Sequence, residues 1–294
     1  RKESSAASDV YKRQVITISS IIYFIYFIRT NTDLLKNFQN ISFFELVIIF
    51  MLKLLSIFCL SNININILKN LNINLHQRES AELTVRNTLG NLTTPFKLGT
   101  GYKVSFLKNK YDLKLTDFIY WNTFFSILNL VPLTLLFLTI SVWNSAFFLK
   151  GNYIYLIIGL FLICIITFLI YNLNFIKNRI YRYKLISSNN FKIQISNLVY
   201  FFSSSTIIYI LASNFTLSIE YYSALSYSFL NSFINLLNLT PGNIGIKETV
   251  LILLDDIHSI SFQVIIIISF IERVITFLAL LFSQIILKFK KPLL

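Results

Sequence analysis

The sequence predicts an all-α integral membrane protein with about six full transmembrane helices and two re-entrant broken-helix hairpins in an inverted repeat. Of the 294 residues, 55% are hydrophobic and only 13% are charged, whereas a soluble domain carries about 25% charged residues. Apolar runs of about 20 residues, the length that crosses the hydrocarbon core, recur along the chain. Two further apolar segments are broken in their middle by proline and glycine.

The first fourteen residues differ in composition from the rest of the chain. Arg1–Gln14 is polar and rich in serine and alanine, and it changes abruptly to an apolar run at Val15. We therefore expect residues 1–14 to be a non-native or disordered leader and residues 15–294 to form a single transmembrane domain.

Six segments have the composition of full spans. They are Val15–Ile28, Phe43–Leu60, Asp117–Ser141, Tyr153–Tyr171, Ile193–Ala212 and Ser261–Leu287. Lysine and arginine gather in Ser61–Thr116, in the loop after Tyr171 and in the C-terminal tail. Because cytoplasmic loops carry the excess of basic residues, we expect a multi-pass protein of the cell (inner) membrane with a cytoplasmic C-terminus.

The two broken segments, Leu83–Leu107 and Ser218–Leu254, contain a similar pattern. Asn91–Gly99 and Asn238–Gly245 both begin with Asn-Leu-Thr and end with Pro-x-x-x-Gly. Proline removes a helical hydrogen bond and glycine lets the chain reverse, so each pattern predicts the tip of a re-entrant hairpin. Three full spans separate the tips, which predicts the inverted repeat that many transporters build around a substrate site. The tip residues are Pro95, Gly99, Pro241, Gly242 and Gly245.

That repeat has an alternative explanation. The chain is rich in asparagine, isoleucine and phenylalanine, and short matches arise by chance in such sequences. In this alternative interpretation, the two broken segments are unrelated loops and not a pair of related hairpins.

Several charged side chains fall within or beside apolar segments, where each costs about 2.5–3.5 kcal/mol on insertion scales. They are Lys53, Lys247, Glu248, Glu272 and Arg273. Lys247 follows the second tip, at the start of a half-helix whose free N–H groups favour an anion. We expect a lipid phosphate to be bound by Lys103, Lys247, Arg273 and Lys97, with Glu248 and Glu272 as their charge partners.

These polar groups also have structural interpretations. Glu248–Arg273 and Glu272–Lys53 fit equally well as ion pairs that hold the helices together, and Lys53 alone is expected to snorkel to the membrane surface. A polar stripe at helical spacing favours interhelical hydrogen bonds over a path for a lipid head group. The stripe consists of Ser228, Asn231, Asn235 and Asn238.

The sequence gives no positive case for catalysis. Cys59 and Cys164 lie inside apolar runs, and His76 and His258 lack the spacing of a ligand pair. The net charge of +13 arises mainly in short loops, which is typical of membrane proteins and does not require nucleic acid. We expect no catalytic residue, no metal, no cofactor and no nucleic-acid partner.

The two tips resemble a known family. Thr94–Leu107 is similar to the "TPGKLGE…K…LL" segment of the lysylphosphatidylglycerol synthase transmembrane-region family of flippase-like proteins, and Thr240–Glu248 to its "PGGLGxRE" segment. Ile271–Phe277 resembles its later "xRxxxF" helix. Thr100 stands where the family has a glutamate, and Asn243 where it has a glycine.

The resemblance implies a lipid flippase that binds an anionic or isoprenoid-phosphate lipid and moves it between leaflets. The aminoacyl-transferase domain of some relatives is absent from this sequence, so we expect no enzymatic activity. The alternative is a non-transporting accessory subunit of cell-envelope lipid or glycan synthesis. The partners implied are a membrane lipid (an anionic phospholipid or a polyprenyl phosphate), an envelope-synthesis enzyme and a second copy of the chain.

Overall fold

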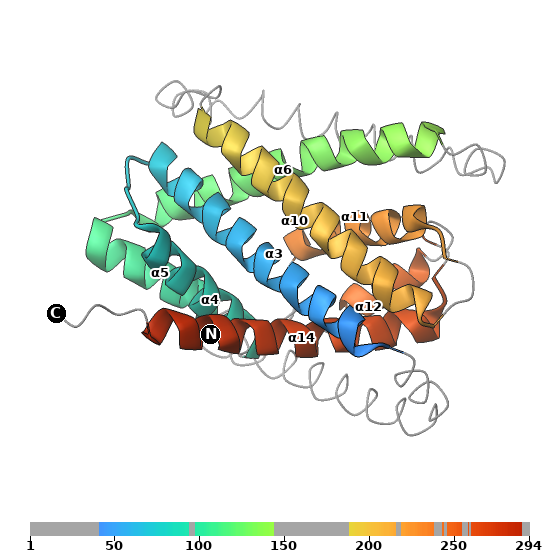
Figure 1. Cartoon of the computed structure of the whole chain (residues 1–294). Coiled ribbons are helices and arrows are strands. Elements are labelled where there is room, and N and C mark those ends of the chain that lie inside the picture. The colour runs from blue at the N-terminus through green and yellow to red at the C-terminus, as the bar shows by residue number, and fades with distance from the viewer. Residues whose placement is uncertain are drawn as a thin grey trace, which may run out of the picture. The chain divides into compact units, whose positions relative to one another are not determined.

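The computed structural model describes residues 41–93, 98–143, 188–215, 219–237, 246–254 and 260–289, together with residues 243 and 258. The regular structure of these residues is helical throughout, which confirms the predicted all-α class for this part of the chain (Figure 1). Its helices are α3 (Phe43–Asn70), α4 (Gln77–Thr93), α5 (Leu98–Tyr111), α6 (Leu115–Trp143), α10 (Ser188–Ser213), α11 (Tyr221–Leu237), α12 (Ile246–Leu253) and α14 (Phe262–Phe289).

Three of the described helices, α3, α10 and α14, are long and apolar enough to cross a membrane. They correspond to the predicted spans Phe43–Leu60, Ile193–Ala212 and Ser261–Leu287. Helix α6 covers the predicted span Asp117–Ser141, and within it Asn129–Thr139 is a shorter apolar stretch. Outside the described residues lie the predicted spans Val15–Ile28 and Tyr153–Tyr171 and the expected leader Arg1–Gln14.

Helix α3 begins at a capping box. The Ser42 backbone N–H donates to Glu45 Oε2 at 2.8 Å, and the Glu45 N–H donates to the Ser42 hydroxyl at 3.2 Å. This reciprocal pairing satisfies amide groups that a helix N-terminus leaves without internal partners. Asn214, just after α10, donates from Nδ2 to Glu45 Oε1 at 3.3 Å, and so ties the start of α3 to the end of α10.

Helix α14 directs its carboxylate inward and large apolar side chains outward. Glu272 is only 9% exposed, whereas Leu278, Phe282 and Ile285 are 50%, 44% and 52% exposed. A surface helix of a soluble protein has the opposite arrangement, with its charges toward water. In a membrane the outward apolar face meets hydrocarbon, and an ionisable group faces the interior of the bundle.

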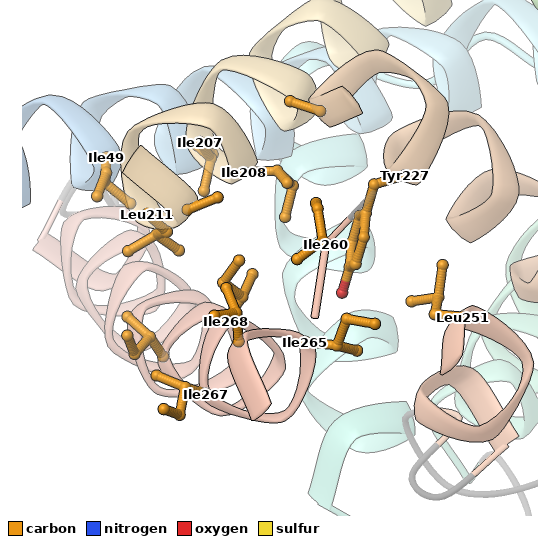
Figure 2. Packing of buried hydrophobic residues seen from close by; sticks show 14 of the residues in the cluster. Ile49, Ile207, Ile208, Leu211, Tyr227, Leu251, Ile260, Ile265, Ile267 and Ile268 are labelled. Carbon is orange, nitrogen blue, oxygen red and sulfur yellow. The ribbon is translucent and has the colours of Figure 1, made fainter. Parts of the chain in front are cut away.

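The described residues pack as two compact units, each with its own core. The first unit takes in residues of 41–54, 85–103 and 204–289, and the second those of 55–84 and 104–203. In the first unit, buried side chains of α3, α10, α11, α12 and α14 form one cluster (Figure 2). Tyr227 reaches into this cluster from α11 with its hydroxyl end directed toward α14. In the second unit, Leu68, Leu83, Leu107 and Phe118 pack together.

Helices α4 and α5 form a helical hairpin. The Asn91 side chain of α4 caps the first turn of α5, because its Oδ1 accepts the Thr100 backbone N–H at 3.0 Å and its Nδ2 donates to Thr100 Oγ1 at 3.0 Å. Near the other ends of these helices, Glu79 accepts hydrogen bonds from the Tyr111 hydroxyl at 2.9 Å and from Lys110. The bond from Glu79 raises the pKa of the Lys110 ammonium. The Asn91–Thr100 bonds therefore join α4 and α5 at one end of the hairpin, and the Glu79 bonds join them near the other.

Gly99 has a different role from the chain reversal that we predicted. It lies in the first turn of α5, where α4 and α5 approach each other backbone to backbone. A Cβ atom on Gly90 would lie 2.6 Å from the Cα of Gly99, and one on Gly99 would overlap the carbonyl oxygen of Asn87. Small residues allow such close helix approach in membranes. Glycine is therefore required at position 99 because there is no room for a side chain between α4 and α5.

We expect Gly99→Ala to destabilise the protein and Gly101→Ala to leave its stability unchanged or slightly raised. The first methyl group would force α4 and α5 apart, and overpacking of this kind costs about 1–3 kcal/mol. A Cβ on Gly101 meets nothing within 4 Å, and alanine favours helix over glycine. Thermal melting of both variants in one detergent measures the difference, and equal melting temperatures would contradict the close approach.

Candidate functional site

Five charged side chains from α3, α12 and α14 meet in the first unit. Glu272 accepts hydrogen bonds from two lysines, with Oε1 2.7 Å from Lys53 Nζ and Oε2 2.8 Å from Lys247 Nζ. Arg273 Nη2 lies 2.7 Å from Glu248 Oε1. We call these five residues the ion-pair network.

The short helix α12 positions two members of this network. It packs against both α11 and α14 (Figure 1), and Lys247 and Glu248 lie in its first turn. Consecutive residues on a helix point about 100° apart, so Lys247 contacts Glu272 while Glu248 contacts Arg273. The sequence correctly predicted that the adjacent Glu272 and Arg273 need separate partners.

Lys247 is enclosed by groups from two other helices. Its Nζ lies 5.7 Å from the centre of the Tyr227 ring, a distance at which a cation is attracted to the face of an aromatic ring. The Tyr227 hydroxyl lies 3.3 Å from the Ser269 Oγ of α14. Only 7% of the surface of Lys247 is exposed, so a carboxylate and an aromatic ring take the place of most of the water around its ammonium group.

The network carries an excess of positive charge. It contains three cations and two carboxylates, so one positive charge has no negative counterpart among its members. Lys53, Lys247 and Glu272 are each no more than 9% exposed. Uncompensated charge is costly to bury, and a bound anion would balance it. The arrangement is therefore suited to anion binding.

Both ion pairs of the structural interpretation are present, since Glu272 contacts Lys53 and Glu248 contacts Arg273. The prediction that Lys53 snorkels to the surface is wrong, because Lys53 is 9% exposed and its ammonium contacts a carboxylate inside the unit. The sequence did not indicate that Lys247 shares that same carboxylate.

The other predicted site residues have different locations. Lys103 is buried on α5 and is not a member of the ion-pair network. Of the four predicted phosphate ligands, the structure brings together Lys247 and Arg273, with both predicted carboxylates beside them. Outside the described residues lie Lys97, Pro95, Pro241, Gly242 and Gly245.

His258 stabilises the C-terminal end of α12, a structural role that its sequence context did not indicate. Its Nδ1 accepts the backbone N–H of Ile260 at 3.1 Å, so the proton must be on Nε2, which lies 2.8 Å from the carbonyl oxygen of Leu251. That carbonyl belongs to the last turn of α12, where helices leave acceptors unpaired. The rings of His258 and Tyr227 pack in a T-shaped arrangement, with their centres 5.6 Å apart and their planes at 65°. Within the described residues, no group of three or more His, Cys, Asp or Glu side chains is arranged to hold a metal ion.

We expect His258→Ala to lower the melting temperature and His76→Ala to leave it unchanged. The first substitution leaves the Ile260 amide without its partner, at about 1–3 kcal/mol for such a buried group. It also removes one of two hydrogen bonds to the Leu251 carbonyl, which keeps the Leu254 N–H at 3.3 Å. His258 is fully buried, whereas His76 is exposed. Differential scanning fluorimetry of the two variants is the measurement, and an unchanged His258→Ala transition would show that α12 does not depend on this cap.

Fold and site together define an α-helical membrane protein with a charged cluster buried among its helices. A family model described as "Lysylphosphatidylglycerol synthase TM region" matches residues 14–283, which include every member of the ion-pair network. The chain belongs to this family, as its tip motifs predicted. Comparison with curated proteins and with solved structures gave no match.

Proposed function

We propose that the protein is a flippase-like lipid carrier of the cell (inner) membrane, with its C-terminus in the cytoplasm. It binds an anionic or isoprenoid-phosphate lipid and moves it between leaflets, and it carries out no covalent chemistry. The observation that supports this proposal most is the ion-pair network, which has one unmatched positive charge on the helices of a membrane protein.

The charge excess favours transport over a purely structural role. Ionisable groups within membrane segments are expensive and usually mark substrate or ion pathways. A network that served only to hold helices together would gain from equal numbers of cations and carboxylates, because net charge is costly to bury even where every cation contacts a carboxylate. A lipid phosphodiester carries a single negative charge, which matches the excess.

The sharing of Glu272 suggests how the anion could bind without disrupting the bundle. Lys247 can turn from Glu272 toward a phosphate while Lys53 keeps the carboxylate paired. The Arg273–Glu248 pair provides a second cation on the adjacent position of α14. Hydrogen bonds from lysine or arginine to a phosphate are charge-assisted and are among the strongest in proteins.

The short length of α12 supports a re-entrant hairpin. Its 8 residues span about 12 Å at 1.5 Å per residue, far less than the hydrocarbon core of about 30 Å. In the proposal, α11 and α12 form a hairpin whose break lies in the membrane, and the N-terminus of α12 directs its partial positive charge at the lipid phosphate. The α4–α5 hairpin, with Lys97 and Lys103, forms the related tip on the opposite face.

Lipid translocation in proteoliposomes tests this proposal. Acyl-labelled NBD-phosphatidylglycerol and NBD-phosphatidylcholine are incorporated separately, and dithionite then quenches the label in the outer leaflet. We expect the protein to accelerate exchange of the anionic lipid more than that of the zwitterionic one. Rates equal to those of protein-free liposomes for both lipids, and for an NBD-labelled polyprenyl phosphate, would refute translocation and favour the accessory-subunit alternative.

A further inference from the structure

His258 joins two helices through two hydrogen bonds to the backbone. Its Nε2 donates to the carbonyl oxygen of Leu251, in the last turn of α12, at 2.8 Å. Its Nδ1 accepts the N–H of Ile260, just before the start of α14, at 3.1 Å. All three residues are fully buried. We call His258 with these two backbone partners the His258 latch, because it ties the end of α12 to the segment that leads into α14.

The two partners fix the protonation state of the ring. A backbone N–H can only donate a hydrogen bond and a carbonyl oxygen can only accept one, so the imidazole is neutral and carries its proton on Nε2. A second proton would occupy Nδ1 and point at the N–H of Ile260, which breaks that bond. A charged ring is also costly to bury. The closed latch therefore holds only the neutral form of His258.

The latch joins the two helices that carry four of the five members of the ion-pair network. The Tyr227 ring, whose centre is 5.6 Å from that of the His258 ring, also lies 5.7 Å from Lys247 Nζ. Helix α12 has only 8 residues, and a helix of this length is not stable without contacts to its neighbours. The position of α12, and of the network residues on it, therefore depends on contacts such as the latch.

The other ionisable groups around the latch titrate outside the range of an imidazole. Tyr227 faces the latch from α11. Besides the ion-pair network, the helices that form the cluster of the first unit carry lysines, tyrosines, one glutamate and one cysteine. Asp255 and Asp256 precede His258 in the sequence but lie outside the described residues. None of these side-chain types has an ordinary pKa between 5.5 and 7.5, whereas that of an imidazole is about 6.5.

We propose that His258 is a pH-operated latch, which releases α12 from the start of α14 when its imidazole takes up a second proton. Falling pH favours the released form because only that form binds this proton, and rising pH restores the closed latch. Release loosens the helix that carries Lys247 and Glu248, so pH acts on the ion-pair network through α12. The latch does not depend on whether the network binds a lipid.

The proposed orientation determines which side of the membrane the latch senses. With the C-terminus in the cytoplasm, α14 begins on the opposite side, where His258 precedes it. The latch would therefore respond to the pH outside the cytoplasm.

Hydrogen–deuterium exchange of the purified protein in detergent, measured by mass spectrometry at pH 5.5 and 7.5, tests the release. Labelling times are scaled so that an unprotected amide exchanges equally at both pH values. If the released imidazole has the pKa of about 6.5 that it has in water, the released population rises about tenfold between pH 7.5 and 5.5. We expect peptides that cover α12 and Ile260 to exchange about tenfold faster at pH 5.5, and peptides of α10 to show no change.

Two histidine variants assign this response to one ring. In His258→Asn the side-chain oxygen can accept the N–H two residues further on, as in an Asx turn, but the amide takes up no proton in this pH range. We expect exchange of α12 in this variant to be the same at both pH values. His76→Asn is the matched control, because His76 is exposed, and it should keep the wild-type response.

A direct measurement of the ring covers the case in which His258→Asn does not fold. The chain has two histidines, so His76→Asn leaves His258 as the only one, and the NMR signal of its carbon-13-labelled Cε1 reports its protonation. We expect a neutral ring at pH 7.5 and loss of protection in α12 at any pH where the ring is protonated.

Three results would overturn the latch. The first is equal exchange of wild-type α12 at pH 5.5 and 7.5. The second is a pH response that persists in His258→Asn, which would assign it to another group such as Asp255 or Asp256. The third is an NMR signal of a protonated ring while α12 keeps the protection that it has at pH 7.5.

Discussion

Glu272→Gln is expected to prevent stable folding. The neutral amide would leave Lys53 and Lys247, whose ammonium groups lie 2.7 and 2.8 Å from the carboxylate, buried without their negative partner. Removing one partner of a buried ion pair costs about 3–5 kcal/mol, a large share of the roughly 5–15 kcal/mol by which proteins are stable. Size-exclusion chromatography in detergent and thermal melting measure the loss.

A compensated variant shows whether stranded charge is the cause. Lys53→Met/Lys247→Met/Glu272→Leu removes all three charges, and replacing a buried ionic group with apolar residues of similar volume is often neutral or stabilising. We expect this triple variant to fold as wild type does while losing affinity for anionic lipid. A wild-type melting temperature for Glu272→Gln alone would show that the two lysines do not depend on the carboxylate.

Lys247→Gln is expected to weaken binding of anionic lipid strongly and folding only slightly. Lys53 would still pair with Glu272, so no carboxylate is stranded, and the network becomes neutral. A hydrogen bond to a charged group contributes about 1.5–3 kcal/mol, so the affinity for phosphatidylglycerol should fall about ten- to hundredfold. Native mass spectrometry of delipidated protein titrated with this lipid measures the change.

The control for that variant is Lys192→Gln. It lowers the net charge of the protein equally, but Lys192 is exposed on α10 and is not part of the network. We expect it to bind phosphatidylglycerol as wild type does. An equal loss in both variants would mean that overall charge, and not the network, attracts the lipid.

Composition and local pattern were sufficient to predict the fold class and much of the site. Backbone groups in lipid must form internal hydrogen bonds, and a continuous apolar run as long as those in α3 and α14 satisfies them within itself by forming a helix. The adjacency of Glu272 and Arg273 implied separate partners because helix geometry turns them apart. The tip motifs were sufficient to predict the family, and the family model that matches residues 14–283 confirmed it.

Features that depend on tertiary contact were not predictable. Lys53 and Glu272 are 219 positions apart, and the length of a lysine side chain fits a snorkelling group as well as a buried one. Gly99 looked like a residue of the turn, but its function depends on the distance between α4 and α5. The polar stripe of α11 favoured interhelical hydrogen bonds, but in the part of the chain that the structure describes Ser228 Oγ and Asn231 Oδ1 make none. Asn238, the last residue of that stripe, lies outside the described residues.

The most direct test of the ion-pair network as a lipid site is a cryo-EM map of the protein in nanodiscs whose only anionic lipid is phosphatidylglycerol. We expect density for a lipid phosphate at about 2.7–2.9 Å from Lys247 Nζ, the length of a charge-assisted hydrogen bond. The same density should be missing from a map of Lys247→Gln. A map with ordered lipid phosphates elsewhere and none at Lys247 would contradict the proposed site.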